Sequence, residues 1–275
     1  MNWFPAPGKL NLFLHVLGRR ADGMHELQTA FRLVDRADRV GIAVREDGEI
    51  RRHDPLPGVH ESDDLCVRAA RLLQREAGVA LGADLALDKR LPIGGGMGGG
   101  SSDAATTLIV LNRLWSAGLP RPRLLDLAAA LGADVPFFVF GENAVGEGIG
   151  ERLRPLALPA AWYVVLVPPV ALSTADVFAD NALTRNTKAL KIPPFFRGLG
   201  ANDLEAVAMR RSPVVAEHLA WLRSRADHAR MTGSGACVFA EFDTQAAAQG
   251  VLDDLPRAMR GFVARGLDRH PLCGY

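Results

Sequence analysis

The sequence predicts an α+β fold built from two lobes. Its 275 residues are 48% hydrophobic and 23% charged, enough for one large or two ordinary domains with a sizeable core. Strand-like and helix-like segments both occur, but without the βαβα rhythm of a doubly wound sheet. The stretch 152–159 carries Pro155 and Pro159 and is the best candidate for a domain boundary. We therefore expect an N-terminal domain over 1–155 and a C-terminal domain over 156–275.

Composition excludes several classes of protein. The net charge is +1, arginines are scattered and aromatic residues make up 7%, so neither nucleic acid nor an acidic membrane is an expected partner. The chain has 3 cysteines, widely spaced and without a Cys-x-x-Cys pair, which is typical of a reducing compartment. There is no signal-peptide pattern and no run of about 20 apolar residues. We expect a soluble cytoplasmic protein with no membrane contact.

The first half of the chain is read from turn signals and apolar periodicity. The residues from Pro5 to Gly8 read as a breaker, and residues 46–60 read as a loop. Alternating apolar residues predict strands, and a 3.6-residue period predicts helices. The expected strands are 9–17, 24–34, 39–45 and 83–87; the expected helices are 62–77, 104–115 and 122–131.

The second half is read in the same way. Residues 144–150 form a second glycine-rich stretch, and 185–200 contains prolines and glycines typical of a loop. Helices are expected after Ser173, after the Asn202–Glu205 stretch, over 213–226 and over about 244–254. Strands are expected over 162–167, after the glycine-serine loop at 231–237, and over about 260–267.

The glycine run at 94–100 is the most informative stretch. It lies between a predicted strand and an apolar helix, where bare amide groups and the positive helix end can hold an anion such as phosphate. Any of Ser101, Ser102 and Asp103 is a candidate N-cap for that helix. A flexible linker is the alternative, but a linker would not lead directly into an apolar helix.

Two familiar phosphate loops do not fit this run. A Walker A loop needs a lysine after its last glycine, and none follows Gly100. A dinucleotide fingerprint can be placed on Gly94, Gly96 and Gly99, but no acidic residue follows at the expected distance of about 20 positions.

Four polar residues elsewhere are candidates for a site. Lys9 and Asn11 share one face at the start of a strand, which suits a ligand cleft but also a solvated strand face. His25 begins a strand, where a lone histidine is more often structural. Asp134 precedes an apolar segment, where an aspartate is usually an N-cap.

Seven ordered stretches resemble known motifs. Residues 5–12, 92–105 and 232–238 resemble the three motifs of the GHMP kinase superfamily. Four more resemble the branch of that superfamily that acts on a cytidine diphosphate-linked alcohol in the non-mevalonate isoprenoid pathway. These are 20–29, 132–138, 173–178 and 202–205.

The resemblance implies a fold and a reaction. It implies an N-terminal lobe like the second domain of ribosomal protein S5, a ferredoxin-like C-terminal lobe, and an active site between them. It implies transfer of the γ-phosphoryl group of ATP to the 2-hydroxyl of 4-diphosphocytidyl-2-C-methyl-D-erythritol. ATP is expected to bind with Mg²⁺, with Ser101 or Ser102 as hydroxyl partners and no carboxylate cage from the protein.

The resemblance also assigns residues to roles. Lys9 and Asp134 become the catalytic pair. The expected acceptor-side residues, which bind the substrate and its cytosine, are Asn11, Met24, His25, Thr174, Phe178, Gly233, Ser234 and Gly235. The residues expected to hold ATP are Asp64, Leu65, Lys89, Pro92, Gly94, Gly95, Gly96, Met97, Gly98, Gly99, Gly100, Ser101 and Ser102.

Three positions depart from the family pattern. Met24 stands where a tyrosine normally stacks on the cytosine. A stacking partner contributes about 1–3 kcal/mol, so the affinity for the cytidine group is expected to be lower, although the polarizable thioether still packs there. Gly95 and Met97 stand where alanine and leucine are common, and neither change is expected to matter much.

Three alternatives remain beside this reading. A sister GHMP kinase would act on another small alcohol, such as mevalonate, homoserine or a sugar. A nucleotide-binding regulator without catalysis would keep the fold, but Lys9, Asp134 and the loop serines are all present. A dinucleotide-binding module is disfavoured by the missing acidic residue. The expected oligomeric state is a monomer or a weak homodimer.

Overall fold

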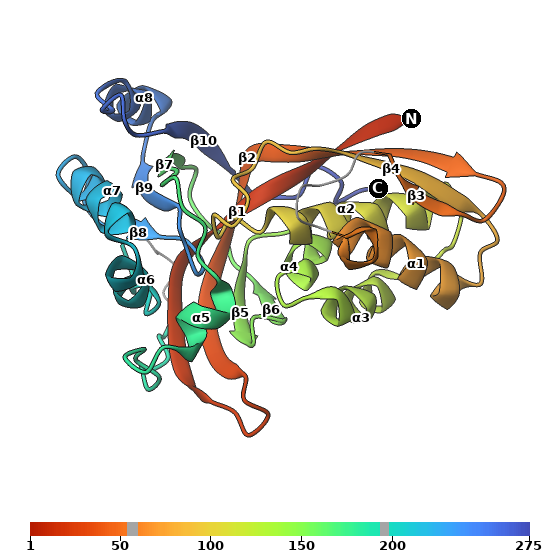
Figure 1. The fold of residues 1–275 in the computed structure, drawn as a ribbon, viewed down its shortest axis with the longest axis horizontal. Coiled ribbons are helices and arrows are strands. Elements are labelled where there is room, and N and C mark those ends of the chain that lie inside the picture. Colours follow the sequence, from red (N-terminus) through yellow and green to blue (C-terminus); the bar gives the residue numbers. More distant parts are fainter. Residues whose placement is uncertain (54–59, 193–197) are drawn as a thin grey trace.

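Two long antiparallel strands run through the middle of the molecule (Figure 1). The structure is a computed structural model that describes residues 1–53, 60–192 and 198–275. Strand β1 (Asn2–Arg19) pairs with β2 (His25–Arg45) from one end to the other. The predicted division into separate strands over 24–34 and 39–45 is therefore wrong, because β2 is continuous through the polar residues between them.

The predicted breaker at Pro5–Gly8 is also wrong, because these residues lie inside β1. β1 pairs only with β2 among the described strands, so it is an edge strand, where a proline without an N–H group is tolerated. A register shift between Pro7 and Gly8 accommodates the local irregularity. This shift brings Lys9 opposite Leu33.

The N-terminal part of the chain forms a sheet with helices packed against it. β2 pairs antiparallel with both β4 (Gly82–Asp88) and β5 (Ala144–Gly148). β3 (Ile50–Arg52) lies parallel to β4, and β6 (Arg152–Pro155) lies antiparallel to β5. Strand β5 was not predicted, since its glycines interrupt the apolar alternation that signals a strand.

The helices of this lobe lie together on one side of the sheet (Figure 1). They are α1 (Leu65–Ala77), α2 (Gly99–Leu114), α3 (Arg121–Leu131) and α4 (Val135–Phe140), with a 3₁₀ turn at Glu61–Asp63. Their apolar faces and the sheet enclose one core that includes Leu33, Ile42 and Leu108. The predictions of helices over 62–77 and 122–131 are confirmed within about one turn.

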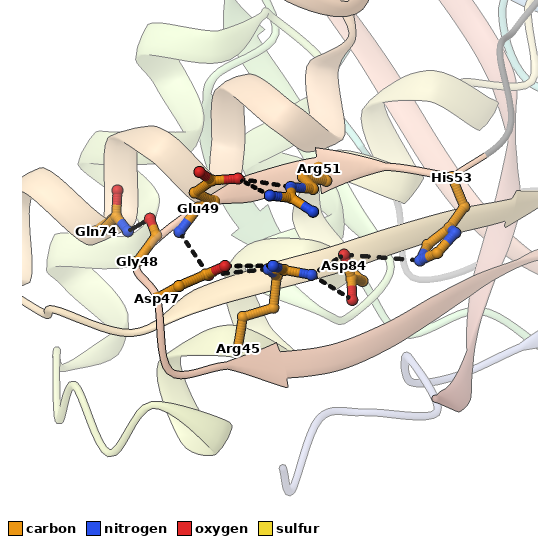
Figure 2. Close-up of polar contacts among 8 residues, drawn as sticks. All are labelled: Arg45, Asp47, Gly48, Glu49, Arg51, His53, Gln74 and Asp84. Atoms are coloured by element: carbon orange, nitrogen blue, oxygen red, sulfur yellow. Dashed lines mark hydrogen bonds and ion pairs between the residues drawn. The ribbon is translucent and has the colours of Figure 1, made fainter.

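Polar side chains close the outer edge of this sheet (Figure 2). Arg45 donates to both Asp47 and Asp84, and Asp47 accepts from the amide of Glu49 at 3.1 Å. Gln74, on α1, donates to the carbonyl of Gly48 at 2.8 Å. Exposed ion pairs contribute about 0.2–1 kcal/mol each, so these contacts mainly fix the turn between β2 and β3.

The C-terminal part of the chain has a second sheet and a second core. β7 (Trp162–Leu166) lies between β9 (Val238–Phe242) and β10 (Gly261–Leu267), antiparallel to both, and β8 (Arg230–Met231) flanks β9. The helices are α5 (Thr174–Ala179), α6 (Glu205–Arg211), α7 (Pro213–Arg223) and α8 (Gln245–Asp253). The predicted strands and helices of this region are confirmed to within a few residues.

β10 connects the two sheets. Its last two residues, Gly266 and Leu267, pair with Val34 and Leu33 of β2. The strands therefore follow one path, β3-β4-β2-β10-β7-β9-β8, with β1, β5 and β6 beside it. The mixed α+β architecture is confirmed, while the domain boundary at 155/156 stays a prediction. No helix in the described part of the chain is long and apolar enough to cross a membrane.

The helix that follows the glycine run begins earlier than expected. Gly98 is its N-cap, with a left-handed φ of 72°, and Gly99 and Gly100 are already helical. The prediction that Ser101, Ser102 or Asp103 caps this helix is therefore wrong. Because the helix starts inside the glycine run, its first free amides belong to residues with little or no side chain.

Candidate active site

A cavity of about 690 Å³ brings most of the predicted site residues together. Strands β1 and β2, helix α5 and the two glycine-containing loops contribute residues to its walls. Asp134, directly before α4, contributes one more. The predicted residues that line it are Lys9, Asn11, Asp64, Leu65, Lys89, Pro92, Gly94, Gly95, Gly96, Met97, Gly98, Gly99, Gly100, Ser101, Asp134, Thr174, Phe178, Gly233, Ser234 and Gly235. Three predicted residues, Met24, His25 and Ser102, are not part of this lining.

Lys9 is a buried cation held by two hydrogen bonds and one ion pair. Its side chain is 3% exposed, and Nζ donates to Asn11 Oδ1 at 2.5 Å and to the carbonyl oxygen of Gly96 at 2.9 Å. The third partner is Asp134 Oδ2 at 3.3 Å. Two hydrogen bonds and an ion pair therefore hold the ammonium group in the cavity wall. The solvated-face alternative for Lys9 and Asn11 is wrong.

Asp134 is held by Lys9 and not by the helix that follows it. It occupies the N-cap position of α4, but its side chain makes no capping hydrogen bond and its backbone is in the right-handed helical region. The carboxylate is 35% exposed and lines the cavity. The N-cap interpretation of Asp134 is therefore wrong. Its carboxylate lies beside the buried ammonium of Lys9 and lines the cavity.

Asn11, which accepts from Lys9, is itself held by a chain of hydrogen bonds. Asn11 Nδ2 donates to Thr29 Oγ1 at 2.9 Å, and that hydroxyl donates to the carbonyl of Phe13 at 2.5 Å. The amide nitrogen of Asn11 donates to Thr232 Oγ1 at 3.0 Å. Thr29 and Thr232 were not predicted as site residues. The position of each within a matched stretch was the only signal, since their roles depend on contacts between distant segments.

The glycine loop needs glycine where it meets its neighbours. Gly96 has a φ of 77°, and a Cβ there would lie 2.1 Å from the carbonyl oxygen of Thr232. Gly98 also has positive φ, and a Cβ there would meet the Phe138 ring at 3.0 Å and Lys9 Cε at 3.2 Å. Both positions therefore allow close approach, of backbone to backbone at Gly96 and of backbone to the Lys9 side chain at Gly98.

The two glycine loops contact each other directly. The amide of Cys237 donates to the carbonyl of Gly95 at 3.2 Å, and Thr232 Oγ1 lies 3.3 Å from the carbonyl oxygen of Gly96. Asn202 donates to the carbonyl of Gly233 at 2.8 Å, which fixes the second loop from the C-terminal lobe. Loops from both lobes therefore form one wall of the cavity.

Thr174 and Ser234 meet in the wall of the cavity. Their hydroxyl oxygens lie 2.7 Å apart, and both residues line the cavity. Ser173 caps α5 by accepting from the amide of Asp176 at 3.3 Å, so Thr174 stands at the first position of that helix. The predicted Ser/Thr cap of this helix is confirmed.

Lys89 is part of a buried charge cluster beneath the glycine loop. Its ammonium donates to both Asp38 and Asp103, the latter at 2.6 Å. Burial lowers the pKa of Lys89, but the two carboxylates outweigh it and the pKa is raised. Asp38 and Asp103 were not predicted. Lys89 still lines the cavity, although its charge is already balanced within the protein.

His25 and Phe178 form an aromatic pair at the edge of the cavity. Their ring centroids are 5.0 Å apart with an interplanar angle of 32°. Burial, then the charges of Arg185 and Arg19, lower the pKa of His25. Met24 precedes His25 and is 48% exposed. Of Met24, His25 and Phe178, only Phe178 lines the cavity. His25 lies beside the cavity, in contact with the Phe178 ring.

The two loop serines differ in exposure. Ser101 lines the cavity at the N-terminus of α2, whereas Ser102 is fully buried and its hydroxyl has no hydrogen-bond partner in the described structure. Across residues 1–53, 60–192 and 198–275, no group of three or more His, Cys, Asp or Glu side chains is arranged to hold a metal ion. A metal ion in this cavity would therefore depend on phosphate oxygens, water and a serine hydroxyl.

Comparison with known proteins identifies the class of this fold and site. Residues 64–142 match the family model "GHMP kinases N terminal domain", and residues 187–261 match "GHMP kinases C terminal". Among solved structures, a mevalonate kinase superposes with a TM-score of 0.69 at 14% identity, covering 98% of this chain and 100% of its own. At that identity the match shows a shared fold alone.

Closer relatives are found among curated proteins. A 4-diphosphocytidyl-2-C-methyl-D-erythritol kinase of Nitrosospira multiformis is 63% identical over 98% of this chain and 92% of its own length. One from Thiobacillus denitrificans is also 63% identical, over 98% of this chain and 96% of its own. A crystal structure of a 4-(cytidine 5'-diphospho)-2C-methyl-D-erythritol kinase has a TM-score of 0.83 at 34% identity, covering 96% and 99%.

The chain therefore belongs to the GHMP kinases, a class of ATP-dependent small-molecule kinases with two lobes around a glycine loop. Within that class it belongs to the family of 4-diphosphocytidyl-2-C-methyl-D-erythritol kinases. The two-lobed α+β prediction is confirmed. The sister-kinase and regulator alternatives are not favoured, and the dinucleotide-binding module is excluded.

Proposed function

We propose that this enzyme transfers the γ-phosphoryl group of ATP to the 2-hydroxyl of 4-diphosphocytidyl-2-C-methyl-D-erythritol. One observation carries the proposal: a single cavity is lined both by the Lys9–Asp134 pair and by Phe178, which stacks near His25. The charged pair suits phosphoryl transfer to a hydroxyl. The aromatic pair suits a nucleobase, and an acceptor without a base would not need it.

Asp134 and Lys9 are assigned to the transfer step. Phosphoryl transfer passes through a loose transition state, so positioning and charge stabilisation supply most of the catalysis. Asp134 orients the acceptor hydroxyl and accepts its proton late in the reaction. Lys9 holds Asp134 at 3.3 Å and offsets the negative charge that develops on the transferred group.

The glycine loop is assigned to the triphosphate of ATP. Gly99, Gly100 and Ser101 are the first residues of α2, whose amides have no acceptor within the helix. These amides and the positive end of a 16-residue helix favour a bound phosphate. Asp64, Leu65 and Lys89 line the same cavity and are assigned to the adenine side.

Mg²⁺ is assigned to the same phosphates. Ser101, which lines the cavity, fits a cation that keeps most of its ligands as phosphate and water, whereas the unpartnered hydroxyl of Ser102 is fully buried and lies outside the lining. When bound, Mg²⁺ would neutralise charge on the phosphate oxygens. Ser101 would orient that end of the nucleotide from the first turn of α2.

His25, Phe178 and Met24 are assigned to the cytosine. Phe178 offers a π-face, and His25 offers a ring nitrogen to the edge of the base. Met24 is 48% exposed, so its thioether is free to pack on the other face of the ring. Gly233, Ser234 and Gly235 close over the acceptor from the second lobe, beside Thr174.

A panel of acceptors tests the proposal. Purified enzyme, ATP and Mg²⁺ are assayed for ADP release with the cytidyl substrate, mevalonate, homoserine and galactose. Turnover with the cytidyl substrate alone supports the proposal. Turnover with another acceptor would remove His25 and Phe178 from substrate recognition. Binding of ATP without any turnover would favour a regulator.

Three further proposals concern the location of the enzyme, its oligomeric state and its domain division. A small-molecule kinase of a precursor pathway is expected in the cytoplasm, as a monomer or a weak homodimer. The division of the chain at 155/156 places the glycine loop in the first domain and Thr174 with Gly233 in the second. Size-exclusion chromatography with light scattering checks the oligomeric state.

A further inference from the structure

Arg185 connects the two residues assigned to the cytosine. It lies in the segment after α5, and its Nε donates to His25 Nε2 at 3.0 Å. Its Nη2 donates to the carbonyl oxygens of Phe178 and Asp180, both at 2.8 Å. One guanidinium therefore holds the His25 ring and the backbone of Phe178 at the same time. Nothing in the sequence pattern had marked Arg185.

The Arg185–His25 contact determines where the imidazole proton lies. A guanidinium only donates hydrogen bonds, so His25 Nε2 must be the acceptor and carries no proton. The neutral ring then has its proton on Nδ1. No hydrogen bond to Nδ1 is present within the described structure.

The charges around His25 keep this ring neutral. Arg185 faces it from the segment after α5, and Arg19 stands opposite it in the β1–β2 pairing. Burial and these two cations lower the pKa of His25 from its ordinary value. Protonation would also set an N–H group of the ring against the N–H group of Arg185. At neutral pH His25 is therefore a neutral donor with a fixed direction.

We propose that Arg185 is a positioning residue for substrate specificity: it fixes His25 so that Nδ1–H donates to an acceptor atom of the cytosine ring. The same guanidinium holds the backbone of Phe178, on whose ring the base stacks. The proposal rests on the proposed function, because it assumes that the base lies between these residues. Cytosine offers N3 and O2 as acceptors on its edge, which suits a single fixed donor.

Nuclear magnetic resonance of the ligand-free enzyme tests the link between Arg185 and His25. The ¹⁵N shifts of the His25 ring are assigned by their loss in His25→Ala. The wild type should show the Nδ1–H tautomer and a pKa below the ordinary histidine value. Arg185→Met should give a mixture of tautomers and raise that pKa. An Nε2–H tautomer in the wild type, or an unchanged tautomer and pKa in Arg185→Met, would overturn the proposal.

Steady-state kinetics tests the consequence for the substrate. Arg185→Met should raise the KM for the cytidyl substrate about fivefold, the effect of one hydrogen bond, with kcat and the KM for ATP nearly unchanged. Arg211→Met is the matched control, because Arg211 anchors the same segment through Asp180 Oδ2 at 3.0 Å. The control should leave all three constants unchanged. An equal rise in the control would make the effect one of segment packing and would overturn the proposal.

A double variant separates His25 from the rest of the segment. Adding Arg185→Met to His25→Ala should raise the KM less than about twofold further, because residues acting through one contact are not additive. A further rise as large as that in the wild-type background would mean that Arg185 acts through the backbone of Phe178 or the packing of the segment and not through His25, and would overturn the proposal. If no variant, nor the wild type, turned over the cytidyl substrate, the proposed function would fail. The tautomer measurement on the free enzyme would still decide whether Arg185 fixes His25.

Discussion

The carboxylate of Asp134 lies 3.3 Å from the ammonium of Lys9 and makes no bond to the helix that begins beside it. The two residues are 125 positions apart in the sequence, at 9 and 134, and come from β1 and from the turn before α4. The ammonium of Lys9 also donates hydrogen bonds to Asn11 and to the carbonyl of Gly96, which belongs to the glycine loop. Lys9 therefore connects the carboxylate of Asp134 to the glycine loop.

Replacing Asp134 by asparagine should reduce kcat by about 100-fold or more, since the amide cannot accept the proton of the hydroxyl. The KM for ATP should change little, because Asp134 is proposed to act on the acceptor hydroxyl and not on the nucleotide. The unfolding temperature should fall, because no capping bond is lost but the buried Lys9 ammonium loses its charged partner. Initial-rate kinetics and a thermal melt check both points. Near-normal turnover would remove Asp134 from the catalytic pair.

Replacing Phe178 by alanine should raise the KM for the cytidyl substrate and leave the KM for ATP unchanged. The ring supplies one face for the base and packs on His25 at 5.0 Å between centroids. Loss of one stacking partner is worth about 1–3 kcal/mol, or about 5- to 150-fold in affinity.

Phe262→Ala is a suitable control for this variant, because Phe262 is partly buried in β10 and does not line the cavity. It removes the same side chain from a different place and should leave both KM values unchanged. If Phe178→Ala weakened ATP and the cytidyl substrate equally, the ring would not be part of the cytosine site.

Local signals in the sequence predicted the parts of the site that depend on near neighbours. The glycine loop was found because it stands between a strand and a helix. The helix after Ser173 was found from its cap. In both cases the residues that determine the structure lie within a few positions of one another, so their pattern is visible in one chain.

The missed features depend on contacts between distant segments. Thr232 bonds to Asn11 across 221 positions, and Asp38 reaches Lys89 across 51. Strand β5 is ordered by its pairing with β2, which overrides its glycines. For Asp134 the residues alone left a cap and a catalytic role open, because the missing capping bond and the contact with Lys9 exist only in the folded chain. No pattern along one sequence carries such information.

Replacing Gly98 by alanine should raise the KM for ATP and lower kcat. The added Cβ would meet the Phe138 ring at 3.0 Å and Lys9 Cε at 3.2 Å, in a left-handed conformation that alanine rarely adopts. The loop or the lysine must then move, and either shift disturbs phosphate binding.

Gly250→Ala is the matched control for this change. Gly250 lies within α8, and nothing lies within 4 Å of a Cβ added there. Alanine in a helix interior should stabilise the protein by about 0.5–1 kcal/mol and leave the kinetics unchanged. Kinetics and thermal melts of both variants check the pair. Wild-type kinetics in Gly98→Ala would show that the loop does not require glycine at this position.

The cluster of Asp38, Lys89 and Asp103 should make stability depend on pH. Two carboxylates share one ammonium, and Asp38 also accepts from the amide of Leu91 at 2.7 Å. Asp103 Oδ1 is buried without a partner in the described structure. Burial raises the pKa of Asp103 to about 7, with Asp38 and Asp64 adding to the rise against the opposing effect of Lys89. Below about pH 7, Asp103 should therefore hold a proton in the folded state.

The sign follows from the number of bound protons. An unfolded aspartate titrates near pH 4. Between about pH 4 and pH 7 the folded chain keeps a proton on Asp103 that the unfolded chain has lost, so the free energy of unfolding falls as pH rises through this window. Asp103→Asn, which is neutral at every pH and keeps an acceptor for Lys89, should remove this dependence. Relative to the wild type it should be more stable at pH 8 than at pH 5.

Denaturant midpoints at pH 5, 6, 7 and 8 measure this difference. Asp126→Asn is the control, since Asp126 pairs with Arg123 on the surface and its side chain is 65% exposed. Its pH dependence should match that of the wild type, because exposed pairs contribute little. Parallel curves for Asp103→Asn and the wild type would mean that Asp103 is ionised in the folded state throughout this range. Lys89 would then be shared by two charged carboxylates beneath the glycine loop.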